Sequence, residues 1–255
     1  MVFRIVFFGT ATFFFLWGTA RAGNPGGSVV GEEYRNRYAL SNASQKLIDN
    51  YGKGYSGLYG TRNFRAVLNG VYYRGGANNL YFVPKRANSN PLPTKGLENL
   101  CKEGFSHAVY FYSTNFSSAP KSLRCKDFHG NENTIEYLQI SPLHYRAADL
   151  KTLITMIYDH VRDPRLGPIY DHCWNGWHAS GFVGAITLRQ FCGFTGDQAV
   201  AYWNLNTDGN NKGTGYDDLR ARIRAFTPYA GMRLSAEEKA ELCPKPGTLG
   251  FSAGK

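Results

Sequence analysis

Residues 172–181, with the sequence His-Cys-Trp-Asn-Gly-Trp-His-Ala-Ser-Gly, contain the strongest candidate for a reactive group in this chain. Cys173 ends an apolar run and precedes a segment with helical spacing, so the residues after it should form a helix N-terminus. Unpaired amides and the helix dipole favour negative charge at such an end, and the same field favours thiolate over thiol. A thiolate in an anion-binding turn is a nucleophile toward phosphate esters. We therefore predict that Cys173 is a nucleophile, with a buried core cysteine as the alternative.

Four residues of this stretch, His172, Cys173, Gly176 and Ser180, match a known signature. The signature is His-Cys, five residues, Arg, then Ser or Thr, with Gly three residues after the Cys. The chain here resembles the cysteine-dependent protein tyrosine and dual-specificity phosphatases. Segment 70–77, Gly-Val-Tyr-Tyr-Arg-Gly-Gly-Ala, is similar to the Tyr-Arg-Ser-Gly opening of bacterial members. The resemblance spans roughly residues 65–230.

The resemblance implies a role for each matched residue. Cys173 would form a cysteinyl-phosphate, His172 would hold the loop and support the thiolate, and Ser180 would help the thiolate leave. Gly176 allows the backbone to approach an oxyanion closely. The substrate-binding positions would be those of the loop that follows the cysteine, namely Trp174, Asn175, Gly176, Trp177, His178 and Ala179.

The arginine of the signature is absent, because its position holds Ala179. In the family this arginine clamps two phosphate oxygens, and charge-assisted bidentate pairs of this kind are strong. Loss of one preorganised oxyanion donor lowers a rate by ~10²–10³. Two nearby residues are candidate substitutes, a protonated His178 and Arg74 of the Tyr-Arg-Gly-Gly segment. Loop packing and surface charge are the alternatives for these two residues.

The general acid of the family lies on the loop that follows a strand predicted here at residues 135–140. His144 occupies roughly that place and could protonate a leaving oxygen; a surface histidine is the alternative. Trp174 and Trp177 either wall an apolar or sugar-stacking pocket or pack on the N-terminal segment. The Asn-rich run 204–211 either folds back over the site or is an ordinary turn.

The pattern of apolar residues predicts an α/β fold, with a phosphatase-type central sheet flanked by helices and the reactive loop between a strand and a helix N-terminus. Strands are predicted at 71–74, 108–112, 135–140 and 168–171. Helices are predicted at 96–104, from 147 to about 161, from about 182 to a C-terminal cap at Gly193, and from a capping box at Thr195 and Gln198.

The first 22 residues combine a basic residue, a short apolar core dotted with Thr and Gly, and Ala20-Arg21-Ala22. This pattern predicts a signal peptide cleaved after Ala22 and an exported protein, periplasmic or secreted. A membrane-spanning helix is the alternative, but it needs about 20 predominantly apolar residues. We divide the rest into an N-terminal extension (23–60, with a helix near 43–51), a phosphatase-like domain (61–232) and a tail (233–255).

Cleavage would leave 29 − 2 = 27 basic and 19 acidic residues, a net charge of +8. A basic exported protein favours anionic or phosphorylated substrates and partners, although a merely soluble surface is the alternative. Nothing in the sequence indicates nucleic acid specifically, a stable membrane insertion after cleavage, or an oligomeric state. We expect no cofactor and no metal, since no Cys-x-x-Cys or His-x-x-x-His pair occurs.

All five cysteines follow the predicted signal peptide, so one of them remains unpaired if the others form disulfides. With Cys173 as the reactive thiol, the other four allow three pairings. We favour Cys101–Cys125 and Cys192–Cys243, because each bridge would link a helix to a nearby or returning segment. Simple buried thiols are the alternative.

The sequence therefore supports three hypotheses. The first is an exported phosphatase-like hydrolase that uses a cysteinyl-phosphate and an altered oxyanion clamp. The second is a catalytically weak or inactive pseudophosphatase that binds an anionic or phosphorylated envelope partner. The third is a scaffold or assembly protein that retains the fold.

Overall fold

A computed structural model describes residues 30–40, 42–78, 91–143, 147–163 and 165–245. Its centre is a six-stranded sheet of order β1-β2-β6-β3-β5-β4, in which the four inner strands are parallel and the two edge strands antiparallel. The carboxyl ends of the parallel strands therefore share one edge of the sheet. The strands are β1 (Thr61–Leu68), β2 (Tyr72–Ala77), β3 (His107–Tyr110), β4 (Ser122–Lys126), β5 (Glu132–Gln139) and β6 (Ile169–Cys173).

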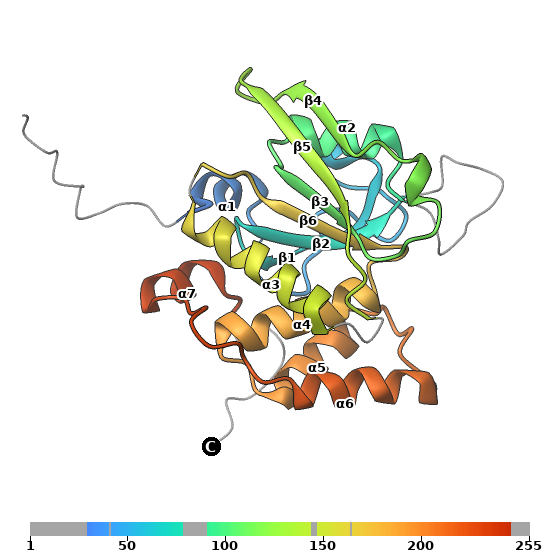
Figure 1. Cartoon of the computed structure of the whole chain (residues 1–255), viewed down its shortest axis with the longest axis vertical. Coiled ribbons are helices and arrows are strands. Elements are labelled where there is room, and N and C mark those ends of the chain that lie inside the picture. Colours follow the sequence, from blue (N-terminus) through green and yellow to red (C-terminus); the bar gives the residue numbers. More distant parts are fainter. Residues whose placement is uncertain (1–29, 41, 79–90, 144–146, 164, 246–255) are drawn as a thin grey trace, which may run out of the picture.

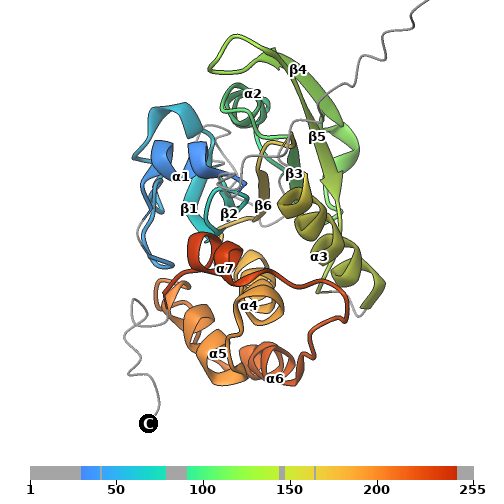
Figure 2. The same ribbon diagram turned by 90° about the vertical axis from the view of Figure 1, so that its left-hand side faces the viewer.

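Helices cover both faces of this sheet, as a largely parallel sheet requires (Figures 1 and 2). The predicted α/β class is confirmed. One face carries α1 (Glu32–Tyr38) and α2 (Thr94–Lys102), and the other carries α3 (Ala147–Arg162), α4 (Ala179–Cys192), α5 (Gly196–Leu205) and α6 (Asp217–Ala225). Helix α7 (Ala236–Leu242) returns to the sheet, and the short 3-10 helices within the described residues are η1 (Ser56–Leu58), η3 (Phe116–Ser118) and η4 (Thr214–Tyr216).

A hydrophobic core lies on each face of the sheet. Successive side chains of a strand point alternately into one core and the other. Ile169 and Cys173 of β6 belong to the core under α3 to α6. Tyr170, between them, belongs to the opposite core, where its ring stacks on that of Phe64 with centroids 5.1 Å apart. The thiol of Cys173 thus faces the layer that contains α4.

Helices α4 and α5 follow the predicted signals. The interior of α4 is almost fully buried, and Gly193 ends the helix with a φ of 72°, a left-handed conformation that glycine adopts readily. Helix α5 begins with a capping box, in which Thr195 accepts from the Gln198 amide and the Gln198 side chain accepts from the Thr195 amide.

The prediction of a helix near residues 43–51 is wrong. The described part of the extension instead forms α1 and then turns, in which Asn42 Oδ1 accepts from the amides of Ser44 and Gln45. Asp49 Oδ1 accepts in the same way from two later amides. Such side-chain bonds compete with helix formation. The backbone of Ile48 pairs with Phe64, so this segment covers the β1 edge of the sheet.

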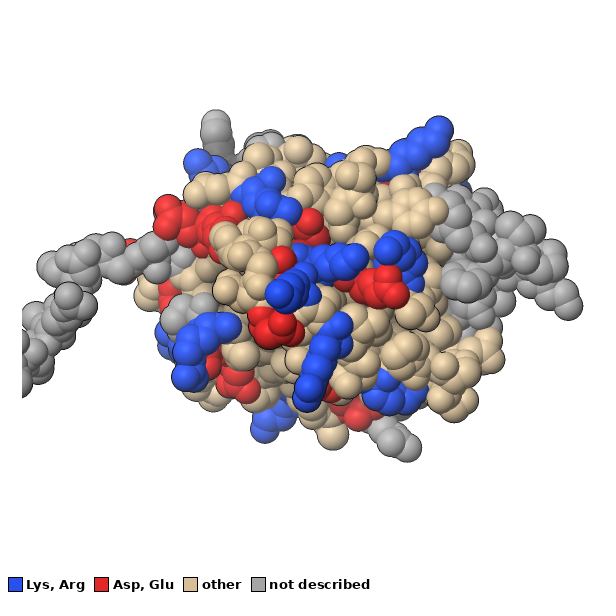
Figure 3. Space-filling view, turned by 90° about the horizontal axis from the view of Figure 1, so that it is seen from above, with Lys and Arg blue, Asp and Glu red and all other residues tan. Residues whose placement is uncertain are grey.

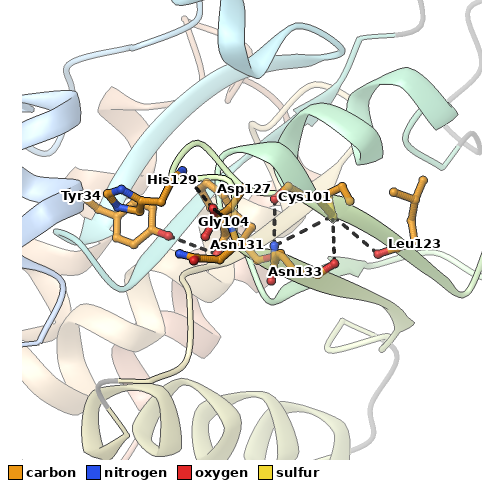
Figure 4. Close-up of a disulfide and its surroundings, with 10 residues drawn as sticks. Tyr34, Cys101, Gly104, Leu123, Asp127, His129, Asn131 and Asn133 are labelled. Carbon is orange, nitrogen blue, oxygen red and sulfur yellow. Dashed lines mark hydrogen bonds between the residues drawn. A yellow bond between two sulfur atoms is a disulfide. The ribbon is translucent and has the colours of Figure 1, made fainter.

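Both favoured disulfides, Cys101–Cys125 and Cys192–Cys243, are present, and Cys173 is a free, buried cysteine. Figure 4 shows the surroundings of Cys101, where Asn133 Nδ2 donates to the carbonyls of Cys101 and Phe105 at 2.8 and 3.1 Å. Among the described helices, none combines the length and apolar character needed to cross a bilayer.

Candidate functional site

Strand β6 delivers Cys173 to the carboxyl edge of the sheet, and α4 begins at Ala179, so residues 173–179 form a turn between strand and helix, called here the Cys173 loop. Cys173 is only 3% exposed, and its Sγ lies 3.6 Å from Ser180 Oγ. The Ser180 hydroxyl also lies 3.0 Å from the Gly75 carbonyl. It has one proton, so it donates either to Gly75 or to a thiolate at Cys173.

Glycines of β2 allow this loop to pack directly on the strand. A Cβ on Gly76 would collide with the carbonyl of Trp174, and Gly76 pairs with Asn175 in an isolated bridge. Gly176 has a φ of 75°, a region that favours glycine. The Asn175 carbonyl accepts from Asn63 Nδ2 at 2.6 Å. The backbone of the Cys173 loop is therefore fixed from the β2 side.

His172 is fully buried behind the thiol and is held at both ring nitrogens. Nδ1 lies 3.1 Å from the Cys173 carbonyl, and Nε2 lies 2.7 Å from the Tyr137 hydroxyl. The carbonyl can only accept, so Nδ1 carries the proton and Nε2 accepts from Tyr137. Burial lowers the pKa of His172 to about 3, so the ring is neutral and positions the backbone at Cys173.

Acidic groups that are influenced by Cys173 are shifted toward their neutral forms. Burial, followed by the negative charge of Cys173, raises the pKa of Asp171 well above its usual value and also raises the pKa of Tyr110 and Tyr112. Within the described residues neither carboxyl oxygen of Asp171 has a hydrogen-bond partner. Asp171 was not singled out in the sequence, because a burial-driven change of protonation has no local sequence signal.

Arg74 lies beneath the Cys173 loop and is fully buried. Its Nη1 donates to the Gly176 carbonyl and its Nε to the Tyr202 hydroxyl, both at 2.7 Å. Gly184 of α4 leaves room for it, because a Cβ there would lie 2.9 Å from Arg74 Cδ. Its Nη2 is buried without a partner in the described chain. A cation therefore supports the loop backbone, and contact of Arg74 with a substrate remains a prediction.

His178 is occupied by the segment that returns after α5. Its Nε2 donates to the Asn210 carbonyl at 2.5 Å, and its ring stacks on Tyr216 with centroids 4.4 Å apart. Burial lowers the pKa of His178, only partly offset by the bond to Asn210. The neutral ring is therefore favoured, and a protonated His178 as substitute for the arginine missing at the fully buried Ala179 remains a prediction.

Asp208 joins the Cys173 loop to two distant parts of the chain and was missed in the sequence. Its carboxylate accepts from Trp177 Nε1 at 3.0 Å, from Lys46 Nζ at 2.7 and 2.8 Å, and from Arg65 Nη2 at 3.3 Å. Burial pushes the pKa of Asp208 up, but the Lys46 hydrogen bond, the Arg65 charge and the Trp177 hydrogen bond outweigh it and lower the pKa. Asp208 is therefore an ionised anchor, and the Asn-rich run 204–211 folds against the loop.

The remaining predicted residues have simpler surroundings. Trp174 and Asn175 are half-buried, and the indole N–H of Trp174 is enclosed without a partner among the described residues. His144, the predicted acid, lies outside the described residues. In the described ranges no group of three His, Cys, Asp or Glu side chains is placed to hold a metal ion.

No protein-family model matches the chain, and no curated protein matches it. Similar solved structures include the core catalytic domain of the PP-IP phosphatase SIW14 from S. cerevisiae, with 13% identity over 65% of this chain and 86% of that chain and a TM-score of 0.42. P. aeruginosa TpbA gives 14% identity, 65% and 85% coverage and a TM-score of 0.41. Tk-PTP in the active form is 14% identical over 64% of this chain and 96% of that chain, with a TM-score of 0.39. At these values only the geometry of the Cys173 loop carries a functional conclusion.

Proposed function

We propose that this protein hydrolyses a phosphate ester through a cysteinyl-phosphate on Cys173. The observation that carries the proposal is the position of the thiol, free and buried, at the N-terminus of α4 and 3.6 Å from the Ser180 hydroxyl. Helix amides and dipole favour a thiolate and a bound oxyanion at the same place.

The reaction has two displacements. The Cys173 thiolate attacks phosphorus, forming an S–P bond and breaking the P–O bond to the ester oxygen, which takes a proton and leaves as an alcohol. Water then attacks phosphorus, the S–P bond breaks, and inorganic phosphate and the thiolate are released. The Ser180 hydroxyl turns from the Gly75 carbonyl to the departing sulfur in the second step. We assign the proton donor of the first step to His144.

In this proposal, Arg74 beneath the Cys173 loop supplies the positive charge that stabilises the phosphate oxygens. Arg74 already donates to the Gly176 carbonyl and keeps one N–H group without a partner in the described chain. A buried guanidinium in this place stabilises negative charge above it even without a bidentate contact. Catalysis through such an indirect clamp should be weaker than with an arginine at position 179.

The second candidate function is binding of an anionic or phosphorylated partner without turnover. Two observations favour it: Ala179 in place of the arginine, and the anchoring of Trp177 and His178 by Asp208 and Asn210. These bonds occupy Trp177 Nε1 and His178 Nε2, two polar groups of the loop that would otherwise be available to a substrate.

We also propose that the protein is exported, periplasmic or secreted. Support comes from the two disulfides, which persist in oxidising compartments, and from the pattern of the first 22 residues.

A small aryl phosphate and the variant Cys173→Ser test the function. An enzyme loses turnover in this variant but keeps substrate affinity, because the nucleophile acts in the chemical step. A binding module shows no turnover, while vanadate or sulfate raises the Tm of the wild type. Arg74→Met, checked for a native circular dichroism spectrum, should weaken that rise. Absence of both turnover and oxyanion stabilisation would refute both functions.

A further inference from the structure

A cavity of about 370 Å³ lies at the far end of α4, bounded by the end of that helix, the connection from α6 to α7, and α7 itself. The connection crosses α4 in both ribbon views (Figures 1 and 2). The volume falls within the range of small-molecule sites. The lining of the cavity includes Arg189, Gln190, Tyr229, Arg233 and Lys239.

The charged side chains that line this cavity are all cations: Arg189 of α4, Arg233 of the connection and Lys239 of α7. Among the described residues no ion pair neutralises any of the three. Arg189 Nε is buried without a partner there, and burial lowers the pKa of this guanidinium. Like charges around one cavity repel each other and favour a bound anion.

The negative C-terminal ends of nearby helices offset only part of this positive charge. Arg189 Nη1 donates to the carbonyls of Ile223 and Arg224 at 2.6 and 2.5 Å, near the C-terminus of α6. The C-terminus of a helix offers roughly half a negative charge. The ends of α4 and α6 therefore offset about one of the three cations.

The walls of the cavity are fixed by bonds that do not involve the cations. Gln190 Nε2 donates to the carbonyls of Tyr229 and Met232 at 3.1 and 2.8 Å, and its Oε1 accepts from the Tyr229 amide at 2.7 Å. The Cys192–Cys243 disulfide joins the end of α4 to the end of α7. The three cations are thus carried by segments with a fixed relation to one another.

We propose that this basic pocket, formed by Arg189, Arg233 and Lys239, binds a small oxyanion of the phosphate or sulfate class, free or as an ester. Guanidinium groups match the oxygens of such anions, and the ammonium of Lys239 adds a point charge. The pocket is separate from the Cys173 loop, since Arg189 lies ten residues along α4 from Ala179, or ~15 Å at the rise of an α-helix.

Calorimetric titration with inorganic phosphate, sulfate and glucose 6-phosphate tests the proposal on the full protein. The double variant Arg233→Gln/Lys239→Gln should bind these anions about 10-fold or more weakly at this site, because two charge-assisted contacts are lost. Both residues are exposed, so the fold should remain intact. The control is Lys126→Gln/Lys212→Gln, which removes the same charge from exposed positions elsewhere and should bind as the wild type does.

Protection of Cys173 from alkylation by the same anions reports the Cys173 loop separately and should be unchanged in the Arg233→Gln/Lys239→Gln variant. Tighter binding of the sugar phosphate than of inorganic phosphate identifies an ester as the ligand, and equal or weaker binding identifies the free ion. No binding outside the Cys173 loop, or an equal loss in the control variant, would overturn the proposal. Failure of the phosphatase proposal would leave this result unaffected.

Discussion

Asp171 places a carboxyl group in the central strand of the sheet, two residues before the thiol and on the same face of β6. Ionisation of this group would set a second negative charge beside the Cys173 thiolate at a fully buried position. Burial and then the charge of Cys173 raise the pKa of Asp171 well above its usual value, which favours the protonated acid. A neutral carboxyl here preserves the field that favours the thiolate.

The variant Asp171→Asn should be more stable than the wild type at neutral pH. The unfolded carboxyl releases its proton near its usual pKa of 3.8, whereas the folded one keeps it, so stability of the wild type falls as pH rises above that value. Asparagine has no proton to lose. Urea unfolding from pH 3 to 8 should therefore show a gap that opens as pH increases. A gap that is constant with pH would mean that Asp171 is ionised in the fold.

Iodoacetamide should modify Cys173 selectively in the native protein below pH 8, because the other four cysteines are in disulfides and the helix N-terminus favours the thiolate. Mass spectrometry of peptides after labelling measures this. Vanadate or sulfate should slow the reaction by occupying the turn. An unreactive Cys173 in folded protein would contradict the role of nucleophile.

At the scale of elements, the strand, loop and helix around Cys173 could be predicted because their signals are local. The apolar run of β6, the helical spacing of α4, Gly193 and the Thr195 capping box all act within a few residues. Strands β1 and β4 were not predicted as strands, because they lie at the sheet edges and are defined by pairing with β2 and β5. The role of Asp208 comes from partners as distant in sequence as Lys46. A repeating pattern of apolar residues does not indicate such long-range ion pairs.

Asp208→Asn should loosen the segment after α5 against the Cys173 loop, while the contacts of His178 with Asn210 and Tyr216 remain. Arg65 is fully buried, and among the described ion pairs Asp208 is its carboxylate partner, so removal of the charge should lower the free energy of unfolding by about 1.5 kcal/mol, less than for a fully buried pair because Asp208 itself is exposed. Trp177 loses a charged acceptor, which tryptophan fluorescence should report. Asp197→Asn, at an exposed ion pair with Arg224, is the matched control and should change stability by less than about 1 kcal/mol. Equal effects would mean that Asp208 is only a surface charge.

A histidine pair ties α3 to the start of β3. His160 Nε2 lies 3.0 Å from Ser106 Oγ and 3.1 Å from His107 Nδ1, while its Nδ1 bonds the Met156 carbonyl at 2.8 Å. The pKa of His160 is lowered to about 4, mainly by burial. Burial also lowers the pKa of His107. Both rings are neutral in the fold at neutral pH.

Stability should therefore fall as pH decreases from about 6.5, where the unfolded imidazole takes up a proton, to about 4, where the folded one does. At 1.36 kcal/mol per pH unit, His160 contributes a loss of ~3 kcal/mol over this range. His160→Gln should reduce the slope of stability against pH, measured by urea unfolding. An unaltered slope in His160→Gln would show that the ring is not held neutral.

Over the whole molecule, the positive charge is not gathered on the face seen in Figure 3. Lys and Arg side chains alternate there with Asp and Glu, so this face offers no continuous basic patch. Cations without a carboxylate partner among the described residues lie instead at specific places: Arg74 beneath the Cys173 loop, and the basic pocket at the far end of α4. The net charge predicts anionic or phosphorylated partners, and these two places are where that prediction can be tested.

The two disulfides should differ in how much they contribute to the free energy of unfolding. Cys192 and Cys243 are 51 residues apart, whereas Cys101 and Cys125 are 24 apart. In the chain-entropy account the longer loop stabilises by about 4 kcal/mol and the shorter by about 3.5 kcal/mol. The longer bridge also holds α7, whose Leu242 is fully buried and accepts from the Asn69 amide at 2.7 Å.

Cys192→Ser/Cys243→Ser should therefore lower the free energy of unfolding more than Cys101→Ser/Cys125→Ser does, measured by guanidinium unfolding. It should also release α7, which moves Lys239 away from the basic pocket and weakens oxyanion binding there, while protection of Cys173 by oxyanions is kept. The Cys101→Ser/Cys125→Ser variant should leave the basic pocket unchanged, because that bridge lies on the opposite side of the sheet with α2. A larger loss of stability from the shorter bridge, with α7 still in place, would show that the C-terminal helix is held by its packing alone.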